Sequence, residues 1–575
     1  MSHFDTMNQE EFKAHMEYVN KSKTELPPTV LCDFYKLSHM SQYPEGTEYI
    51  YSGWIPRSNK YFPKAKKVVA IGIQALTKKY LIDYFNENFF KRPLEDVIAE
   101  YVRVLKFSLG IENPPTKHIE DLHKLGYLPI LIKAVKEGTL VPIKVPMMTI
   151  VNTNKKFFWL TNFLETIISN EIWLPMTSAT IAYTYRTILN EFALKTTGTT
   201  DGVEFQGHDF SMRGMGALEA SMASGAGHLL SFVGTDTIPA IWYLEKYYKA
   251  NIEKELVGAS IPATEHSVMC AYGQTNELDL FKRLITEVYP SGFFSVVSDT
   301  WDFWKVVGEY LPKLKDEIMA RDGRVVIRPD SGDPVDIICG LPVYDFHENA
   351  EYLEIIEELG ADFRTTNLDK KSYLYKVGEE GAISRVTYKK FGGSVTYNNE
   401  DNVELTIEEK GLIQALWDIF GGTMTAQGYK VLDTHIGAIY GDSITIERAE
   451  EILTRLERKG FASTNIVLGI GSYSYQYNTR DTFGFAMKAT YAVVNGEERM
   501  LFKDPKTDDG TKRSLRGMVA VIEDGYHDEI ICVDGLDKES YKPYSSGDLL
   551  ETVFEDGELL RDQSLAEIRE ILHKC

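Results

Sequence analysis

From residue 203 onward, short apolar runs recur along the chain, and each ends in a polar or glycine-containing cluster. Most runs are separated by helical stretches such as residues 238–256 and 445–460. An apolar strand with a polar end, followed by a helix and repeated, is typical of parallel βα units. So many units in a row favour a closed βα barrel over an open sheet. The runs are VEFQGHDF (203–210), HLLSFVGTDT (228–237), GASIPATEHS (258–267), FFSVVSDTWD (293–302), RVVIRPDSGDP (324–334), GAIYGDSI (437–444), NIVLGIGSYSY (465–475) and FAMKATYAVV (485–494).

The flanking regions have other patterns. Residues 1–28 are polar, end in ELPP and are expected to form an N-terminal arm. The next segment mixes predicted strands (PILIKAV, TLVPIKV, MTIVNT) with helices, the clearest of which covers residues 157–173. We therefore expect a mixed α/β domain from residues 29–198 and 484–575, beside a barrel domain over residues 199–483.

One stretch, at about residues 341–408, interrupts the βα series. Its first part, HENAEYLEIIEELG, has a helical pattern, and its second part has the pattern of strands joined by glycine-rich turns. We interpret the stretch as an insertion. It is either a solvated surface excursion or a lid or oligomer contact.

Composition limits the classes of function. Five cysteines lie far apart among 575 residues and form no CxxC pair, which argues against a zinc site or a disulfide framework and favours a reducing compartment. The start of the chain lacks a signal-peptide pattern and no run of about 18 apolar residues exists, so we expect a cytoplasmic protein without a membrane span. The net charge of −22 argues against nucleic acid as a partner. A small phosphate ligand would then need a local concentration of Arg and Lys.

The polar ends of the predicted strands carry the candidate chemistry, because active sites of βα barrels lie at the C-terminal ends of the strands. His266 follows one strand, and imidazole can act as a base, an acid or a phosphoryl acceptor. A lone histidine is more often structural, but the position of His266 at a strand end favours a functional role. Asp299 and Asp330 end two other strands. They could orient an imidazole, hold a ribose diol or bind Mg²⁺, and the spacing leaves these alternatives open.

Several cations and aromatic residues are candidates for ligand contacts. Arg213 and Arg328 suit an anion or amide clamp, because a guanidinium binds phosphate and carbonyl oxygens. Phe210 and Tyr35 could be ligand contacts or core. The glycines of GIGSYSY would let backbone N–H groups approach a phosphate, although this run is not a P-loop. A basic group follows at Arg480, Lys488, Lys503, Lys512 and Arg513, of which the last two could also be surface cations.

Ten ordered matches over roughly residues 29–515 resemble the nicotinamide phosphoribosyltransferase family. One such motif could occur by chance, but not ten in order. The matching segments are DFYKLSHMSQYP (33–44), WLTNFLETI (159–167), DGVEFQGHDFSMRG (201–214), GTDT (234–237), GASIPATEHS (258–267), SVVSDTWD (295–302), IRPDSGDP (327–334), GDSI (441–444), TRD (479–481), and VVNGEERMLFKDP (493–505) with KRS (512–514).

The resemblance implies a fold and a reaction. The fold is a distorted βα barrel, like that of type II phosphoribosyltransferases, with an adjoining α/β domain, in a homodimer with two shared active sites. The reaction joins nicotinamide to 5-phosphoribosyl 1-pyrophosphate, giving nicotinamide mononucleotide and pyrophosphate with Mg²⁺, as the first step of NAD salvage. ATP, as an activating co-substrate, would phosphorylate the active-site histidine.

The resemblance also assigns roles by position. His266 would be the phosphorylated histidine and Asp299 would orient it. Phe210 and Tyr35, the latter from the other subunit, would sandwich the nicotinamide ring. The amide would face Asp236 through its NH₂ group and Arg328 through its oxygen. The ribose and phosphate contacts would be Asp330, Gly441 and Asp442 for the ribose, Gly471 and Ser472 for the 5′-phosphate, Arg57, Arg480, Lys488 and Lys503 across the dimer, and Arg213 lining the site.

The sequence departs from the family pattern at the phosphate. GIGSYSY replaces a glycine-rich run, and Ala486 stands where the family has a serine. The close alternative function is a nicotinate phosphoribosyltransferase, and Asp236 argues against it because a carboxylate repels nicotinate. The other alternative is a non-catalytic binding protein with the same fold, against which the retained His266, Asp299 and Arg480 argue.

Overall fold

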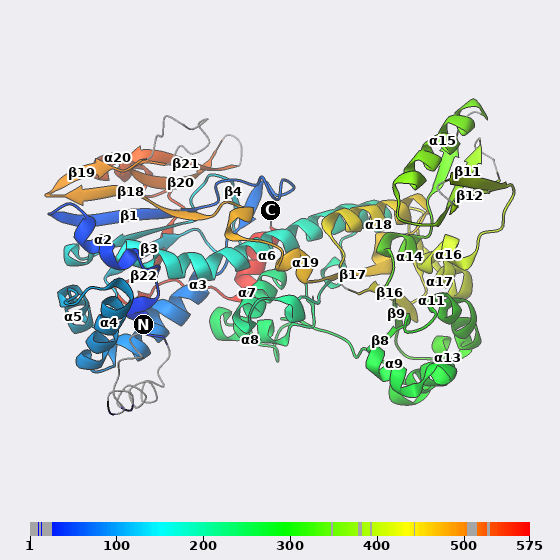
Figure 1. Cartoon of the computed structure of the whole chain (residues 1–575), viewed down its shortest axis with the longest axis horizontal. Helices are drawn as coiled ribbons and strands as arrows, with labels where there is room; N and C mark the ends of the chain where they lie inside the picture. The colour runs from blue at the N-terminus through cyan, green and yellow to red at the C-terminus, as the bar shows by residue number, and fades with distance from the viewer. Residues whose placement is uncertain are drawn as a thin grey trace.

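The computed structural model describes residues 10, 13, 26–346, 349–377, 382–391, 394–441, 443–502, 515–525 and 529–574. Most of the predicted N-terminal arm lies outside these residues. An antiparallel sheet lies towards one end of the molecule and a parallel sheet towards the other (Figure 1). In the described part of the chain no helix is long and apolar enough to cross a membrane.

The antiparallel sheet combines early and late parts of the chain. The strands predicted between residues 129 and 153 are present, and two of them lie in this sheet. The apolar pattern grouped the run at 485–494 with the βα units, although the predicted domain boundary at 484 assigned it to the α/β domain. The run pairs antiparallel with an early strand and is not part of the parallel series. Asn495 and Gly496 have φ of 52° and 77°, which is the geometry of a tight hairpin turn rather than of a βα unit. In spatial order the strands are β19 (Glu497–Met500), β18 (Ala486–Val494), β1 (Thr47–Ile55), β5 (Met148–Asn152), β3 (Ile130–Ala134), β22 (Glu551–Glu555) and β23 (Glu558–Leu559).

The parallel sheet forms the predicted distorted βα barrel. All its neighbouring strands pair in parallel. The segment 258–264 joins its two edges, since Ala259 pairs with Gly234 and Ala263 pairs with Ser295 as isolated parallel bridges. The ring is thus closed by one irregular segment. In spatial order the strands are β7 (Gly234–Thr235), β6 (Gly207–Asp209), β17 (Ile466–Ile470), β16 (Ile436–Tyr440), β9 (Val325–Arg328) and β8 (Phe294–Val297).

The strand predicted from residue 228 is much shorter than expected. Helix α7 (Leu218–His228) ends where that strand was expected to begin. The following apolar residues make turns back onto the helix, with the N–H of Phe232 donating to the carbonyl of His228 over 3.1 Å. The periodicity of a short apolar run cannot show whether the run forms a strand or the turns that follow a helix.

Helix α6 (Leu160–Thr197) confirms the helix predicted at 157–173 and extends it to 38 residues. Its first half, with Leu164 and Ile172, packs in the core beside the antiparallel sheet. Its second half, with Tyr185 and Leu189, packs in the core of the barrel. One helix therefore belongs to both cores and connects them.

The insertion has the predicted helix followed by strands, and a small core of its own around Phe363 and Tyr388. Arg385 attaches it to the barrel side through hydrogen bonds of 2.6 Å from Nε and Nη2 to the two carboxylate oxygens of Glu409. A cavity of about 470 Å³ lies between the insertion and the barrel, with Trp304 and Lys370 in its lining. The elements are β10 (Val343–Phe346), α15 (Asn349–Thr365), β11 (Lys370–Val377), β12 (Ser384–Phe391) and β13 (Ser394–Glu400).

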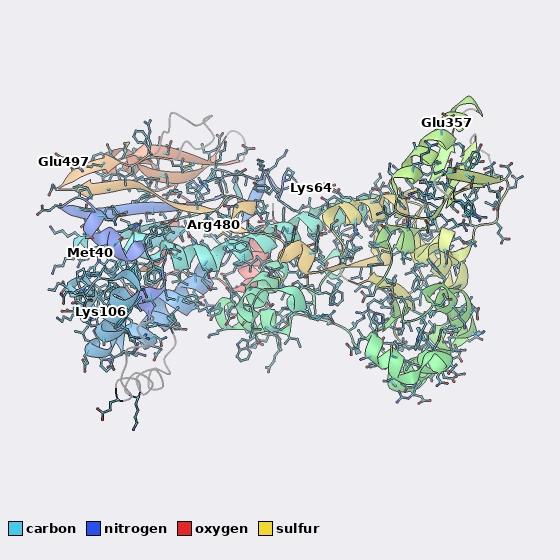
Figure 2. All side chains as sticks on the ribbon, in the orientation of Figure 1. Met40, Lys64, Lys106, Glu357, Arg480 and Glu497 are labelled. Atoms are coloured by element: carbon cyan, nitrogen blue, oxygen red, sulfur yellow. The ribbon has the colours of Figure 1, made fainter. Side chains whose placement is uncertain are left out.

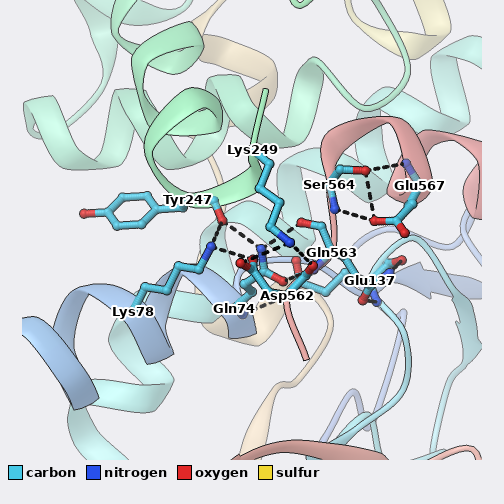
Figure 3. A network of polar contacts seen from close by, with 9 residues as sticks. All are labelled: Gln74, Lys78, Glu137, Tyr247, Lys249, Asp562, Gln563, Ser564 and Glu567. Atoms are coloured by element: carbon cyan, nitrogen blue, oxygen red, sulfur yellow. Dashed lines mark hydrogen bonds and ion pairs between the residues drawn. The ribbon is translucent and has the colours of Figure 1, made fainter. Parts of the chain in front are cut away.

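The C-terminal segment joins early and central parts of the chain (Figure 3). Lys78 Nζ donates to Asp562 Oδ1 over 2.6 Å, and Lys249, beside the barrel helix α8 (Ile238–Tyr248), donates to the Asp562 carbonyl over 2.7 Å. Gln74 and Gln563 exchange hydrogen bonds of 2.9 and 2.7 Å. Residues 562 and 563 thus fasten residues 74–78 to the end of α8, whose apolar side chains pack in the same core as the antiparallel sheet, before α21 (Leu565–His573) begins.

Candidate active site

His266 and two carboxylates meet at the C-terminal ends of the barrel strands. His266 begins α9 (His266–Tyr272), directly after the segment that closes the ring. Its Nε2 lies 3.9 Å from Asp299 Oδ1 and 3.8 Å from Asp330 Oδ2, and its Nδ1 lies 3.2 Å from Thr300 Oγ1. The structure therefore brings together three residues that the sequence placed at separate strand ends, and their roles stay predictions.

The two carboxylates differ in burial. The Asp299 side chain is 5% exposed and that of Asp330 is 33% exposed. Asp299 Oδ2 accepts a hydrogen bond of 3.2 Å from the N–H of Asp330, while its buried Oδ1 has no hydrogen-bond partner. Burying a carboxylate oxygen without a hydrogen bond costs free energy, so this atom is suited to bind a donor or a cation.

Asp236, Phe210 and His208 form a second group at neighbouring strand ends. Asp236 Oδ1 accepts hydrogen bonds of 2.9 Å from His208 Nε2 and 2.7 Å from Ser260 Oγ. The rings of His208 and Phe210 lie 4.4 Å apart and are tilted by 32°. Burial raises the pKa of Asp236, but the hydrogen bonds from His208 and Ser260 and the charge of Arg328 outweigh it, so that the pKa is below its ordinary value. The group is a carboxylate at neutral pH.

Arg328 ends β9 on the same side of the barrel. Its Nη2 donates to the carbonyl of Thr264 over 3.1 Å, and its buried Nε has no partner. The guanidinium is therefore held in place with a donor still free, as an amide or anion clamp requires.

Glycines bring the backbone close to Asp330. A Cβ atom at Gly441 would lie 1.7 Å from Asp330 Oδ1, and one at Gly469 would lie 1.4 Å from the carbonyl oxygen of Gly441. Only a hydrogen atom fits at these two positions. The backbone of Gly441 therefore lies directly against the Asp330 carboxylate on one side and against Gly469 of β17 on the other. Asp442 lies outside the described residues.

The predicted phosphate cradle lies beside this point. Ser472 begins the short helix α19 (Ser472–Tyr475) after Gly471, and its Oγ packs against Gly214, next to the exposed Arg213. The exposed rings of Tyr473 and Tyr477 stack with centroids 5.2 Å apart. Ala486 is buried at the start of β18.

The basic residues gather on the antiparallel sheet instead. Arg57 donates from Nε to the carbonyl of Gly484 over 2.8 Å. Partial burial lowers the pKa of Lys488, and the neighbouring charges of Arg57 and Arg480 lower it further against the opposing effect of Glu165. These three cations therefore lie close together, while Lys503, Lys512 and Arg513 are outside the described residues. In Figure 2, Arg480 lies towards the middle of the molecule and Glu357, in the insertion, at one end.

Tyr35 belongs to this side as well. It precedes α2 (Lys36–Gln42), its side chain is 57% exposed, and α2 and α9 lie towards opposite ends of the molecule (Figure 1). In the part of the chain that the structure describes, no hydrogen bond or ion pair links Tyr35, Arg57 or Arg480 to the His266 group. Within one chain, the two sets of predicted site residues stay apart.

Comparison with known proteins decides the family. The model of the nicotinate phosphoribosyltransferase family matches residues 205–383 and 396–558, and that of the nicotinamide phosphoribosyltransferase N-terminal domain matches residues 29–103. A nicotinamide phosphoribosyltransferase of Acinetobacter baylyi is 45% identical over 557 residues, covering 95% of this chain and 97% of that protein. The chain belongs to the nicotinate phosphoribosyltransferase family.

A more distant relative and a solved structure are also similar to this chain. A nicotinamide phosphoribosyltransferase of Xanthomonas campestris is 29% identical over 544 residues, covering 93% of this chain and 96% of that protein. The crystal structure of human nicotinic acid phosphoribosyltransferase aligns with 95% of this chain and 93% of its own, at a TM-score of 0.47 and 14% identity. As a member of this family, the chain is a pentosyltransferase, and the reading as a non-catalytic binding protein is set aside.

Sequence reasoning missed three contacts in the family's site. They are the hydrogen bonds of His208 and Ser260 to Asp236 and the contact of Thr300 with His266. His208 stands two residues before Phe210 in the matched HDF segment, and this proximity was the available signal. Among the described residues no group of three or more His, Cys, Asp or Glu side chains forms a metal cage. A cation here would need ligands from the substrate, as is usual for Mg²⁺.

Proposed function

We propose that this enzyme transfers the phosphoribosyl group of 5-phosphoribosyl 1-pyrophosphate to nicotinamide, which gives nicotinamide mononucleotide and pyrophosphate in the first step of NAD salvage. The observation that supports nicotinamide is the ionised Asp236 beside Phe210. A carboxylate accepts a hydrogen bond from an amide NH₂ and repels the carboxylate of nicotinate. Arg328, with its free Nε donor, would bind the amide oxygen.

The transfer needs positioning more than acid–base chemistry. The ring nitrogen of nicotinamide is already nucleophilic, and Phe210 holds the ring on one face. Asp330 beside Gly441 offers carboxylate and backbone groups to the ribose hydroxyls. Gly471, Ser472 and Arg213 would line the 5′-phosphate. As pyrophosphate leaves, charge moves onto its oxygens, and fixed cations stabilise this charge best.

Mg²⁺ fits the two carboxylates beside His266. The unpartnered, buried Oδ1 of Asp299 and the carboxylate of Asp330, whose side chain is 33% exposed, are the hard oxygen ligands that this ion prefers. When bound, Mg²⁺ would neutralise charge on the leaving pyrophosphate.

A homodimer with shared active sites would bring the separated groups together. Tyr35, Arg57, Arg480, Lys488 and Lys503 would enter the site of the partner subunit, with Tyr35 covering the second face of the nicotinamide ring. The separation of α2 from α9 within one chain supports this arrangement. In such a dimer each site needs both chains.

ATP would act through His266. The imidazole is 47% exposed, so a nucleotide can reach it, and Asp299 and Asp330 would stabilise its cationic form. A phosphoryl group on this ring would add negative charge near the pyrophosphate site and favour product release. The cytoplasm as compartment stays a prediction.

A turnover assay tests the proposal. Purified enzyme with nicotinamide, 5-phosphoribosyl 1-pyrophosphate and Mg²⁺ should form nicotinamide mononucleotide, detected by chromatography against the authentic compound. Nicotinate replaces nicotinamide in the parallel reaction. Equal or faster use of nicotinate would contradict the proposed substrate, and no product with either base would contradict the proposed activity.

A further inference from the structure

Asp236 presents its two carboxylate oxygens unequally. Oδ1 accepts from both His208 Nε2, at 2.9 Å, and Ser260 Oγ, at 2.7 Å. No hydrogen bond from a described residue reaches Oδ2. The side chain is 47% exposed, so the carboxylate is accessible, and protein donors occupy Oδ1 and not Oδ2.

The two donors come from opposite sides of the carboxylate. His208 lies in β6, whereas Ser260 lies in the irregular segment that closes the barrel. Each donor therefore limits a different rotation of the Asp236 side chain, and together they define which oxygen turns towards the ring-binding site.

The orientation of His208 is itself fixed. Its side chain is 10% exposed and its ring packs on Phe210 at 4.4 Å. A Cβ atom at Gly234 would lie 2.9 Å from Nδ1, so the other edge of the imidazole rests against the β7 backbone. Because an ionised carboxylate only accepts hydrogen bonds, the proton of His208 must be on Nε2.

We propose that His208 is a positioning residue for base selectivity, which with Ser260 occupies Oδ1 of Asp236, leaves Oδ2 to accept the nicotinamide NH₂, and aligns Phe210 beneath the ring. This inference rests on the proposed function. The same two hydrogen bonds hold the pKa of Asp236 below its ordinary value, so that a negative charge faces the incoming base. A loosened Asp236 would lose both the amide contact and part of the repulsion of nicotinate.

Paired substitutions at residue 208 test the inference. His208→Gln keeps a donor near the position of Nε2, whereas His208→Phe keeps the ring and removes the donor. We expect His208→Phe to raise the KM for nicotinamide by about tenfold or more, the effect of losing one hydrogen bond to a charged group. The KM for 5-phosphoribosyl 1-pyrophosphate should change by less than about twofold, because that ligand does not touch Asp236. His208→Gln should recover most of the loss.

Ser260→Ala and a control variant complete the series. Ser260→Ala should shift the ratio of kcat/KM for nicotinamide to that for nicotinate in the same direction as His208→Phe. His118→Phe makes the same change at a buried histidine in α5 (Lys117–Leu125), in the other core, and should leave this ratio unchanged. The inference is wrong, and His208 is only structural, if both substitutions at residue 208 lower kcat and raise both KM values to the same extent. The same conclusion follows if His208→Phe leaves the nicotinamide-to-nicotinate ratio of kcat/KM unchanged.

Direct binding separates this inference from the proposed reaction. Calorimetry with nicotinamide alone should show weaker binding to His208→Phe than to the wild-type enzyme and to His208→Gln. If the wild-type enzyme binds nicotinamide with this pattern but makes no mononucleotide, the reaction is wrong and the positioning role stands. If the wild-type enzyme does not bind nicotinamide, the positioning role is contradicted as well.

Discussion

The N–H of Asp330 donates a hydrogen bond of 3.2 Å to the carboxylate of Asp299. This bond joins the ends of two neighbouring barrel strands, β8 and β9, and fixes the Asp299 carboxylate beside His266. The other carboxylate oxygen stays buried and unpartnered. Asp299 Oδ1 is thus a strong acceptor without a protein donor, and a cation or the N–H of a phosphorylated imidazole could bind to it.

Phosphate transfer from ATP should occur at His266. With ATP labelled in its γ-phosphate, label should appear on the wild-type enzyme, vanish in His266→Ala and fall in Asp299→Asn, because the carboxylate stabilises the cationic ring. His435→Ala is the matched control, since His435 also pairs with an aspartate, Asp433, but at the opposite end of β16. Label that survives in His266→Ala would remove the role of this histidine.

Asp236 should decide between the two bases. Asp236→Asn removes the charge and keeps the shape, so the amide loses a charged acceptor worth about 1.5–3 kcal/mol. We expect kcat/KM for nicotinamide to fall by about ten- to a hundredfold and turnover of nicotinate to rise. Steady-state kinetics with both bases measure this change. An unchanged preference would mean that another group reads the amide.

Gly441 should be intolerant of any side chain. Its hydrogen atom faces the Asp330 carboxylate, and the Cβ of alanine would lie 1.7 Å from Oδ1. Gly441→Ala would displace Asp330 from its proposed contact with the ribose, and a shift of about 1 Å can cost about a hundredfold in kcat/KM. The KM for 5-phosphoribosyl 1-pyrophosphate should rise most. Gly525→Ala, where a Cβ meets open space, is the control and should match the wild-type enzyme.

Shared active sites predict complementation between inactive variants. Arg480→Ala and Asp330→Ala would each inactivate both sites of their own homodimer. In a mixed dimer one site carries both changes and the other carries neither, because each site takes residue 480 from one chain and residue 330 from the other. Random mixing at equal concentrations after dissociation should therefore restore about a quarter of the wild-type activity. A mixture that stays inactive, with mixed dimers verified by mass, would place both residues of a site on one chain.

Two buried histidines should make folding sensitive to acid. Burial lowers the pKa of His118 and of His228 to about 4, from an ordinary value of 6.5. Between these values the unfolded chain binds protons that the folded chain does not, so the free energy of unfolding falls as the pH falls from about 6.5 to about 4. The slope is at most about 1.4 kcal/mol per pH unit for each histidine. Urea unfolding at pH 7, 6 and 5 measures it, and His118→Phe should make the slope smaller. An identical slope would assign the acid sensitivity to other groups.

The sequence predicted the barrel and its strand-end residues because this information is local. A polar residue after an apolar run lies at the C-terminal edge of a parallel sheet wherever the run is placed, so His266, Asp299 and Asp330 could be grouped without coordinates. The apolar pattern alone grouped the strand at 485–494 with the βα units, because apolar runs look alike in both sheets, whereas the predicted boundary at 484 assigned it to the α/β domain. The Asn-Gly pair after it was the overlooked signal for a hairpin.

The rest of the site depends on contacts between distant segments. His208 and Ser260 meet on one oxygen of Asp236 only because the irregular segment 258–264 closes the ring, and no periodicity encodes that closure. Tyr35, just before α2, and Arg480, in a short 3-10 helix before β18, lie beside the antiparallel sheet, whereas His266 follows the segment that closes the barrel. Only the tertiary fold sets this separation. The domain boundaries at residues 198 and 484 stay predictions.

Helix α6 has a further consequence for the proposed dimer. Its 38 residues, at about 1.5 Å each, span about 57 Å, with one end in each core. The cations proposed to bind phosphate lie beside one core, and the strand ends of the barrel belong to the other. In the proposed dimer, the length of this helix would set how far the cations of one protomer extend towards the active site of the other. Inserting or deleting one turn of α6 would leave both cores with the same residues. It would, however, shift the proposed phosphate-binding cations of one protomer away from the active site of the other.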